Sequence, residues 1–430
     1  MDAPQPVPAA RIVPANLTGW RHRAPRGKLL VDPETGRIVF PVRQPPKQGV
    51  WVDYHTAFPA DIGGGEYHRP LARPADYTLY RVSRERPGDG VSASINAALQ
   101  AWRDDPAHPR AAVIEILDSA AYSEPLAITL EAGQYLQVRA ADRTRPVIRL
   151  LDYMADASDA FTVAGKRGSR LVLDGLLIAG RGLRVAGPSR EDEERFAAGD
   201  LCDVTIRHCT LVPGWGLTCD CDPRRPGEPS LELVDCTARI RIQWSIIGAI
   251  EVTADETAVD PVAITIEDSI VDATGTARAA LRASNLPLAF ATASFLRCTV
   301  FGGAQLHAIA LAENSIFTGA VRVARRQTGC MRYCYVPPGS RTPRRSHCQP
   351  DPARADAATL VPHFTSVRYG NAAYAQLSTW CAAEIRRGAD DESEPGVFHD
   401  LFQPQREANL RQRLAEYSPA STDTDVVFAN

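Results

Sequence analysis

The chain has 430 residues, with 48 Lys and Arg against 51 Asp and Glu and a formal net charge of −3. Because the charge is nearly balanced, no basic field is available for nonspecific binding to nucleic acid. No apolar run approaches the roughly 20 residues that a membrane helix needs, so membrane insertion is not expected. The hydrophobic fraction of 44% is that of a globular protein with a large buried core.

The N-terminus carries no recognisable export signal. Met1 to Pro4 contains no basic region that leads into an apolar stretch, so we expect no Sec signal. Ten cysteines in 430 residues are too few for a disulfide scaffold. These features predict a chain that is synthesised in the cytoplasm with reduced thiols.

The first segment, residues 1–85, is dominated by proline. Nine prolines lie between Pro4 and Pro46. Since proline fixes φ and lacks a donor, we predict a Pro-rich arm with a small β-hairpin region. The hairpin is expected over residues 28–40, where two apolar runs flank a turn with Pro early and Gly late. A third strand over residues 49–54 could pair with it.

Three consecutive glycines, Gly63 to Gly65, lie further along this segment. A glycine-rich loop can cradle a phosphate, but no GK[ST] motif and no helical pattern come after it. We therefore interpret these glycines as a tight structural turn.

The second segment, residues 86–110, is predicted to be a linker and a capping helix. Ser92 or Ser94 can cap a helix over residues 95–102. Its apolar residues fall at i, i+3, i+4 and i+7 and form one stripe, namely Ile95, Ala98, Leu99 and Trp102. A helix of this kind is suited to cover the open edge of a β-structure.

The third segment, residues 111–329, predicts the fold. It consists of short β-like runs separated by turn residues, and a phrase of the form apolar-x-apolar-x-x-small-x-apolar recurs at irregular spacing. Irregular spacing argues against a propeller and is tolerated by a solenoid, where each coil contacts only its neighbours. We predict a mainly β fold, a right-handed parallel β-helix of about 8–10 coils; a two-sheet sandwich is the alternative. The small residues are expected to stack as an internal ladder: Cys209, Cys236, Ser245, Ser269, Cys298 and Ser315.

The fourth segment, residues 330–430, is predicted to hold a Cys- and Arg-rich loop and a small α-helical region. Residues 374–387 have a helical pattern. Residues 405–417 follow Pro404, which is favoured at the first turn of a helix. The apolar side of this last helix must be buried somewhere, either as a cap over the last coil or against a neighbouring subunit.

Two groups of residues could carry chemistry. Asp220 and Asp222 would point to the same side of an extended chain, which suits an acid pair or a metal; the alternative is that they are ordinary corner residues. The second group offers four side chains with N or S atoms, the ligands that zinc prefers; the alternative is that its thiols are simply buried. The candidate zinc ligands are Cys330, Cys334, His347 and Cys348.

Several stretches resemble a known group of proteins. Residues 31–41 and 61–67 resemble segments of proteins encoded beside baseplate genes of bacterial phage-tail-like contractile injection systems, and residues 399–417 resemble the same group. Residues 88–99 are similar to the entry helix of pectate-lyase-like β-helices, which are common in phage tailspikes. The resemblance implies a structural part of a tail-like particle, and it carries over no catalytic residues.

We therefore expect a non-catalytic baseplate- or tail-associated component without a cofactor or resident metal. Its expected partners are other tail or baseplate subunits, in a cytoplasmic or released particle. The alternative is a polysaccharide lyase or hydrolase that uses carboxylates in a groove of the β-helix. Binding of a cell-surface glycan without cleavage is compatible with the structural function.

Overall fold

The computed structural model divides the chain into two units. One comprises Met1–Ala57 with Leu217–Arg224, and the other comprises Phe58–Gly216 with Arg225–Asn430. Residues 217–224 thus belong to the N-terminal unit, although they lie in the middle of the sequence. The residues described by the structure are 6–33, 36–47, 50, 52, 60–71, 74–150, 161–188, 197–254, 256, 259–284, 286–351, 357–422, 424 and 426.

The N-terminal unit contains a small three-stranded sheet. β1 (Ile12–Pro14) pairs in parallel with β2 (Leu29–Asp32), which pairs antiparallel with β3 (Arg37–Val39). The short 3-10 turns η1 (Ala9–Arg11) and η2 (Thr18–Trp20) flank β1. The predicted hairpin is confirmed as β2 and β3. The third strand expected over residues 49–54 lies outside the described residues except at positions 50 and 52.

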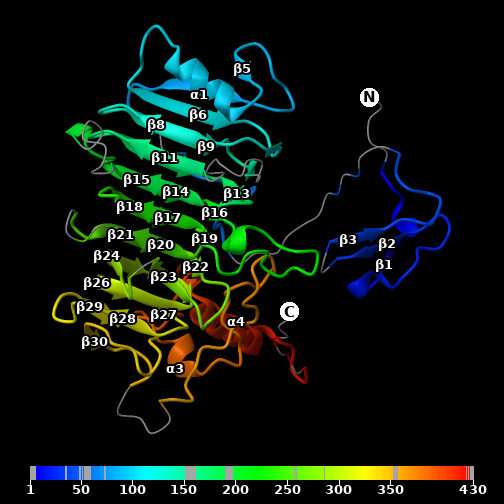
Figure 1. Cartoon of the computed structure of the whole chain (residues 1–430). Coiled ribbons are helices and arrows are strands. Elements are labelled where there is room, and N and C mark those ends of the chain that lie inside the picture. The colour runs from blue at the N-terminus through cyan, green and yellow to red at the C-terminus, as the bar shows by residue number, and fades with distance from the viewer. Residues whose placement is uncertain are drawn as a thin grey trace. The chain divides into compact units, whose positions relative to one another are not determined.

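The second unit contains two large sheets, with eight and 19 strands (Figure 1). All pairings in the eight-stranded sheet are parallel. Its strands are β7 (Ala121–Tyr122), β10 (Val147–Arg149), β13 (Leu177–Ala179), β16 (Thr210–Leu211), β19 (Ile246–Gly248), β22 (Ile270–Asp272), β25 (Thr299–Phe301) and β27 (Ile316–Phe317). A 3-10 turn, η3 (Pro213–Trp215), follows β16.

The 19-stranded sheet contains the remaining strands of this unit. They are β4 (Thr78–Val82), β5 (Val91–Ser92), β6 (Ala111–Ile116), β8 (Ala127–Leu130), β9 (Tyr135–Ala140), β11 (Phe161–Gly165), β12 (Arg170–Asp174), β14 (Leu183–Ala186), β15 (Asp203–Arg207), β17 (Leu231–Val234), β18 (Arg239–Gln243), β20 (Ile250–Thr253), β21 (Val262–Glu267), β23 (Ala279–Ala283), β24 (Ala289–Leu296), β26 (Gly303–Glu313), β28 (Val321–Val323), β29 (Cys330–Arg332) and β30 (Arg344–Ser346).

The pairing follows a period of three strands. From β6 to β23, every strand pairs in parallel with the third strand after it, as in β9 with β12, β10 with β13 and β11 with β14. Side chains alternate between the faces of a strand, so in-register pairing stacks apolar residues on apolar residues. Ile206, Ile242 and Ile266 form one such buried column. The parallel pairing confirms the mainly β prediction and is unlike the antiparallel hairpins of a sandwich.

A single helix covers the first strands. α1 (Ile95–Arg103) packs on β4, β5 and β6, and the side chain of Ser94 accepts a hydrogen bond from the Ala97 amide. Its buried residues are the predicted stripe Ile95, Ala98, Leu99 and Trp102. The helix, its cap and its buried face are therefore confirmed.

A column of small residues runs beside the eight-stranded sheet. The last paired residue of each strand lies opposite the last paired residue of the next strand, and each column member comes two positions after it. The strands concerned are β15, β18, β21, β24, β26, β29 and β30. Ser245 Oγ accepts from the Cys209 amide at 3.1 Å, and Ser269 Oγ accepts from the Ser245 amide at 3.0 Å. The column consists of Cys209, Ser245, Ser269, Cys298, Ser315, Cys334 and Cys348.

The expected ladder was therefore wrong at one position. Cys236 follows β17, which pairs with β14 and β20, so Cys236 lies in a different column. Conversely, Cys334 and Cys348 are members that the recurring phrase did not include. The recurring phrase occurs wherever a strand is followed by a turn at a small residue. Which small residues share a column depends instead on which strands pair.

The residue before each small residue adopts a left-handed conformation. At His208, Trp244 and Asp268 the φ values are 48°, 44° and 47°. This conformation costs a residue with a Cβ about 1–2 kcal/mol. In return the backbone amide reaches the next strand: the His208 amide donates to Gln243 O at 3.0 Å, and the Trp244 amide donates to Glu267 O at 3.2 Å. The corner conformation is thus stabilised by hydrogen bonds between successive strands.

The outer face of the eight-stranded sheet is covered by two chain segments at β19, β22, β25 and β27. Ile62 from one side of the sequence and Val397 and Phe398 from the other side form a buried cluster with Ile246 and Ile270. A second cluster places Leu377, Cys381 and Ile385 near Ile316. At these strands the sheet therefore has buried apolar side chains on both faces, whereas Arg149 of β10 is exposed.

The helical pattern predicted over residues 374–387 was largely wrong. Only α3 (Ala383–Arg386) is helical, while Tyr374 is fully buried and donates to Asp272 Oδ2 at 2.6 Å. The apolar residues there are spaced to cover a sheet rather than to form one helical stripe. The 3-10 turn η4 (His399–Leu401) and α4 (Gln403–Tyr417) follow, and α4 confirms the last predicted helix.

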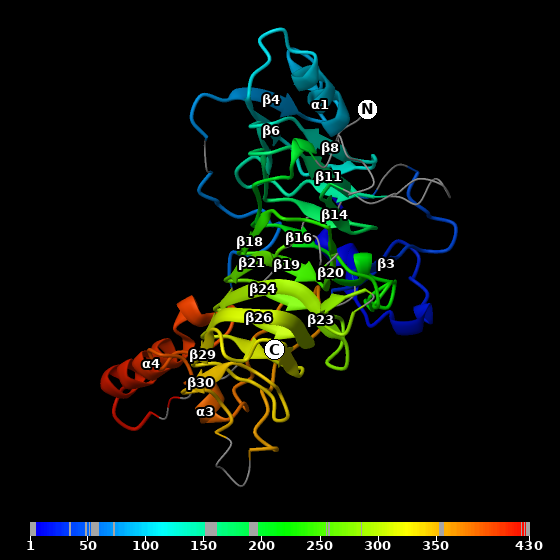
Figure 2. The same ribbon diagram turned by 60° about the vertical axis from the view of Figure 1, so that its left-hand side comes forward.

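Helix α4 extends away from the sheets. Figure 2 shows it projecting at their margin, and Pro404 is its one buried residue. Leu410 is 46% exposed and Tyr417 is 82% exposed. None of the described helices combines the length and apolar character that crossing a membrane requires.

Replacement of Ser269 by Ala tests the small-residue column. The Ser269 hydroxyl donates to Glu267 O and accepts from the Ser245 amide, and the residue is fully buried. Since the change leaves a buried amide unsatisfied, we expect a loss of about 1–3 kcal/mol in the free energy of unfolding, measured by urea denaturation. Ser284→Ala, at an exposed hydroxyl pair with Thr253, is the matched control. Equal effects of the two changes would contradict the ladder.

Candidate functional site

The N-terminal strap, residues 60–69, packs closely on the corner of the eight-stranded sheet. The Gly63 amide donates to Trp244 O at 2.8 Å, and a Cβ on Gly64 would lie 2.7 Å from Leu176 O. Tyr67 Oη lies 2.9 Å from His208 Nδ1. These glycines therefore allow the backbone to approach the sheet, which agrees with their structural interpretation.

Arg69 fixes the end of this strap. It is 1% exposed, and its guanidinium donates to Ala141 O at 2.9 Å and Thr144 O at 3.1 Å. Burial lowers the pKa of His208 to about 4, so this ring stays neutral at physiological pH. The His208 ring stacks on the Trp244 ring, with 5.2 Å between the ring centroids. The charged Arg69 and the neutral His208 thus both hold the strap in place.

The C-terminal clamp, residues 390–399, fastens a second segment to the same corner. The Gly396 amide donates to Asn314 O at 2.7 Å, and Asn314 Nδ2 donates to Asp390 Oδ1 at 2.7 Å. The Val397 amide donates to Thr299 Oγ1 at 3.1 Å. The clamp therefore attaches to corner and sheet positions of neighbouring strands.

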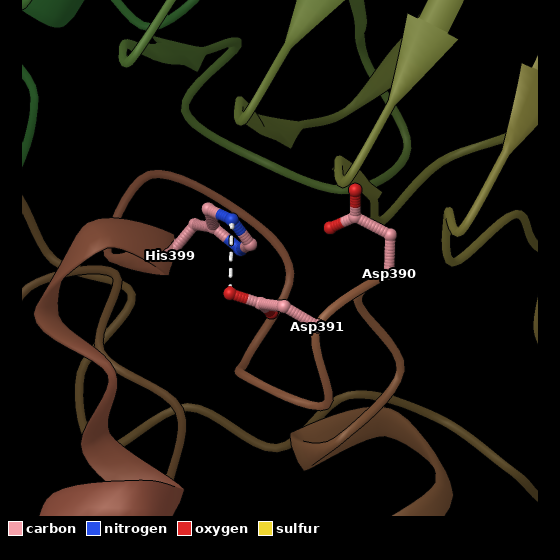
Figure 3. Close-up of side chains that lie close together, drawn as sticks. All are labelled: Asp390, Asp391 and His399. Carbon is pink, nitrogen blue, oxygen red and sulfur yellow. Dashed lines mark ion pairs between the residues drawn. The ribbon is translucent and has the colours of Figure 1, made fainter.

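The clamp also contains a group of possible metal ligands (Figure 3). Ligand atoms of Asp390, Asp391 and His399 lie within 4.8 Å of one another, and this is the one such group among the described residues. Two carboxylates and an imidazole are ligands that suit a divalent transition-metal ion.

These side chains already have protein partners. Asp391 Oδ1 accepts from the Ser393 amide at 2.9 Å, and His399 Nδ1 lies 2.8 Å from Ser393 Oγ. Asp390, Asp391 and His399 line a cavity of about 270 Å³. The Arg297 guanidinium, which pairs with Asp268 at 2.5 Å, lines the same cavity and would repel a cation. These contacts explain why the three side chains lie close together, because they anchor the clamp.

The candidate acid pair lies away from any strand. Asp220 and Asp222 are in the loop that belongs to the N-terminal unit, where Cys221 has a φ of 61° and the chain turns. The sequence analysis expected an extended backbone to place the two side chains on the same side. The backbone turns here instead, so the two side chains are not aligned in that way. Asp220 Oδ1 instead pairs with Arg37 at 2.6 Å, and Arg37 also contacts the carbonyl oxygen of Cys219.

Other carboxylates along the sheets are also engaged. Glu267 accepts from Gln243 Nε2 at 2.8 Å, and Asp272 accepts from Tyr374. Burial raises the pKa of Asp272, and Tyr374 opposes this shift. Asp268 binds Arg297 through both carboxylate oxygens. Each of these carboxylates has a structural partner.

The four candidate zinc ligands are not gathered into one group. Cys334 is 1% exposed in the apolar core, and Cys348 follows it in the small-residue column. His347 stacks on Tyr333 at 5.0 Å, on the outward side of the corner. Cys330 lies at the start of β29. Since Cys334 and His347 lie on opposite sides of the backbone, the close spacing in sequence does not produce a tetrahedral site.

Sequence reasoning missed the clamp and the strap as contacts of one sheet corner. The signal available was weak: in the recurring phrase, the residue before the small one is often polar, as at Asp268 and Asn314. Short polar side chains tolerate the left-handed conformation. The phrase does not reveal which distant segment pairs with them.

Neither a scan against family models nor a search of curated proteins finds a match for this chain.

Glu394 provides a test of how tightly the clamp is buried. Burial raises the pKa of this carboxyl to about 8, with Arg386 opposing the shift. The folded state therefore keeps a proton that the unfolded state loses above its ordinary pKa near 4.5. The contribution of Glu394 to stability should be largest below pH 4.5 and should fall by roughly 2–5 kcal/mol as pH rises to about 8.

Unfolding midpoints in urea between pH 5 and pH 8 measure this effect. Glu394→Gln should flatten the decline and be more stable than the natural chain at pH 8, because the amide needs no proton. Glu392→Gln changes an exposed carboxyl in the same loop and should leave the decline unchanged. A decline that persists in Glu394→Gln would show that Glu394 is not its source.

Proposed function

We propose that this protein is a non-catalytic structural component of a phage-tail-like contractile injection particle. In this proposal the second unit is a right-handed parallel β-helix, and helix α4 docks on a neighbouring tail or baseplate subunit. The particle is assembled in the cytoplasm or released from it, and a cell-surface glycan is a further possible partner.

The strand pairing supports the β-helical part of the proposal. A β-helix requires each coil to pair in parallel with the next, so a period of three strands corresponds to three strands in each coil. β6, β7 and β8 would form one coil, and β9, β10 and β11 would form the next. The columns beside the corners, such as Ser245 above Ser269, are the internal stacking that such a fold needs.

The polar groups support a structural rather than a catalytic function. Asp220, Asp268 and Asp272 each bind a side chain of the protein itself. A glycosidase needs two carboxyls that flank a substrate at roughly 5–10 Å. The residues of the candidate acid pair are instead part of a turn.

The exposure of α4 is the observation that carries the docking proposal. The helix is attached at its start, where Glu407 pairs with Arg386 at 2.7 Å and Gln405 donates to Asp391 O at 3.1 Å. Beyond this point Leu410 and Tyr417 remain exposed. An isolated helix of about 15 residues is marginal in water, so a packing partner for its free side would stabilise it.

Removal of residues 403–430 tests this function. We expect a soluble protein whose unfolding midpoint changes little, because α4 buries only Pro404 while Val397 and Phe398 of the clamp are retained. The truncated chain should be missing from purified sheathed particles, as judged by mass spectrometry. The intact chain should be present in them.

Point variants separate docking from loss of the helix. Leu410→Ser with Tyr417→Ser should reduce incorporation into particles, whereas Gln412→Ser with Arg413→Ser should not. All four positions are exposed, so none should alter folding. Reproducible absence of the intact chain from particles, or normal incorporation of the truncated chain, would refute the proposal.

A further inference from the structure

Arg345 occupies a position that faces the core in the strands before it. β30 pairs in register with β29, so Arg345 lies opposite Met331. The same column is apolar and buried through the preceding strands, at Ile206, Ile242, Ile266, Phe295, Ala312 and Met331. The last strand thus places a guanidinium where the rest of the column has a hydrocarbon.

No carboxylate of the described residues pairs with this guanidinium. Arg345 Nε donates to Thr342 Oγ1 at 2.8 Å, and its Nη2 donates weakly to Ser340 O at 3.4 Å. Burial lowers the pKa of Arg345, against the opposing effect of the neighbouring thiols Cys348 and Cys334. A partly buried charge without a counterion is costly, and an external anion would offset that cost.

A cavity of about 470 Å³ opens beside Arg345. Arg326 lines the same cavity from the segment between β28 and β29. The remaining lining is small, neutral or apolar: Pro338, Gly339, Ser340, Thr342, Pro343, Pro350 and Ala357. Its volume is within the range of small-ligand sites, and its two charged groups are both cationic.

The surroundings of the cavity are strongly basic. Between Glu313 and Asp351 the sequence has seven arginines and no acidic residue. Of these arginines only Arg332 forms an ion pair among the described residues, with Glu313. Arg322 and Arg341 lie opposite each other on neighbouring backbone segments, so their like charges repel.

We propose that this cavity binds a phosphate group through the guanidiniums of Arg326 and Arg345. Guanidinium and phosphate match in geometry, because two parallel N–H groups meet two oxygens. A phosphate also carries more charge than a carboxylate, which suits a site with two arginines and further arginines at its rim. A soluble phosphate ester and a phospholipid headgroup both supply this chemistry.

This site is independent of the docking of α4, so the two proposals can fail separately. A competing account is that an inward charge on the last strand blocks edge-to-edge aggregation. That account requires no ligand, and measurement of binding therefore distinguishes the two.

Calorimetric titration of the full chain with inorganic pyrophosphate at low salt tests the site. We expect saturable binding that weakens at least tenfold in Arg345→Gln and in Arg326→Gln. Arg149→Gln removes an exposed arginine of β10 and should bind like the natural chain. Arg345→Lys should bind more tightly than Arg345→Gln but less tightly than the natural chain, because it keeps the charge and loses the paired donors.

Thermal unfolding of each variant without ligand shows whether it is folded. If Arg345→Gln does not fold, Arg326→Gln still provides the comparison, because Arg326 is exposed. Absence of saturable binding to the natural chain, or equal binding by the natural chain and the glutamine variants, would overturn the proposal.

Vesicles of phosphatidylglycerol identify the source of the phosphate. Co-sedimentation that pyrophosphate abolishes would assign the site to a lipid headgroup. Pyrophosphate binding without co-sedimentation would assign it to a soluble phosphate ester. Either result supports the site, provided that the glutamine variants lose it.

Discussion

The structure of the second unit depends on the in-register parallel pairing of each strand with the third strand after it. This pairing satisfies backbone amides between neighbouring strands and stacks core-facing apolar residues in columns, such as Ile206, Ile242 and Ile266. It also sets the corner, where His208, Trp244 and Asp268 accept a left-handed conformation so that their amides reach the following strand. A shift of one residue in any strand would exchange its buried and exposed faces, so the register is strongly specified.

The same pairing determines how distant segments attach. The strap near Gly63 and the clamp near Gly396 both approach the eight-stranded sheet closely, since a Cβ at either glycine would lie under 3 Å from a threonine hydroxyl of that sheet. The clamp is hydrogen-bonded to corner side chains such as Asn314. These side chains are regularly spaced only because the strands are in register. The carboxylates of Asp390, Asp268 and Asp272 are used in these attachments and in contacts along the corner.

Two features of the C-terminal part of the second unit are not fully satisfied by contacts among the described residues. Arg345 faces a cavity at β30, the last strand of this column among the described residues. Helix α4 leaves the clamp at Phe402, which has a φ of 51°, and exposes Leu410 and Tyr417. Arg345 has no carboxylate partner among the described residues, and α4 leaves Leu410 and Tyr417 exposed; the two proposals rest on these features.

The sequence alone determined the elements whose signal is local. Capped α1, the β2–β3 hairpin, α4 and the mainly β character follow from capping, turn and periodicity rules that need only a few neighbouring residues. Tertiary structure decided the rest, because pairing partners are not encoded locally. It separated Cys236 from the column of Ser245, removed the helix predicted around Tyr374, and brought Asp220 to Arg37 from a position far along the chain. Residues that share a sequence pattern contact one another only where the register of the strands brings them together.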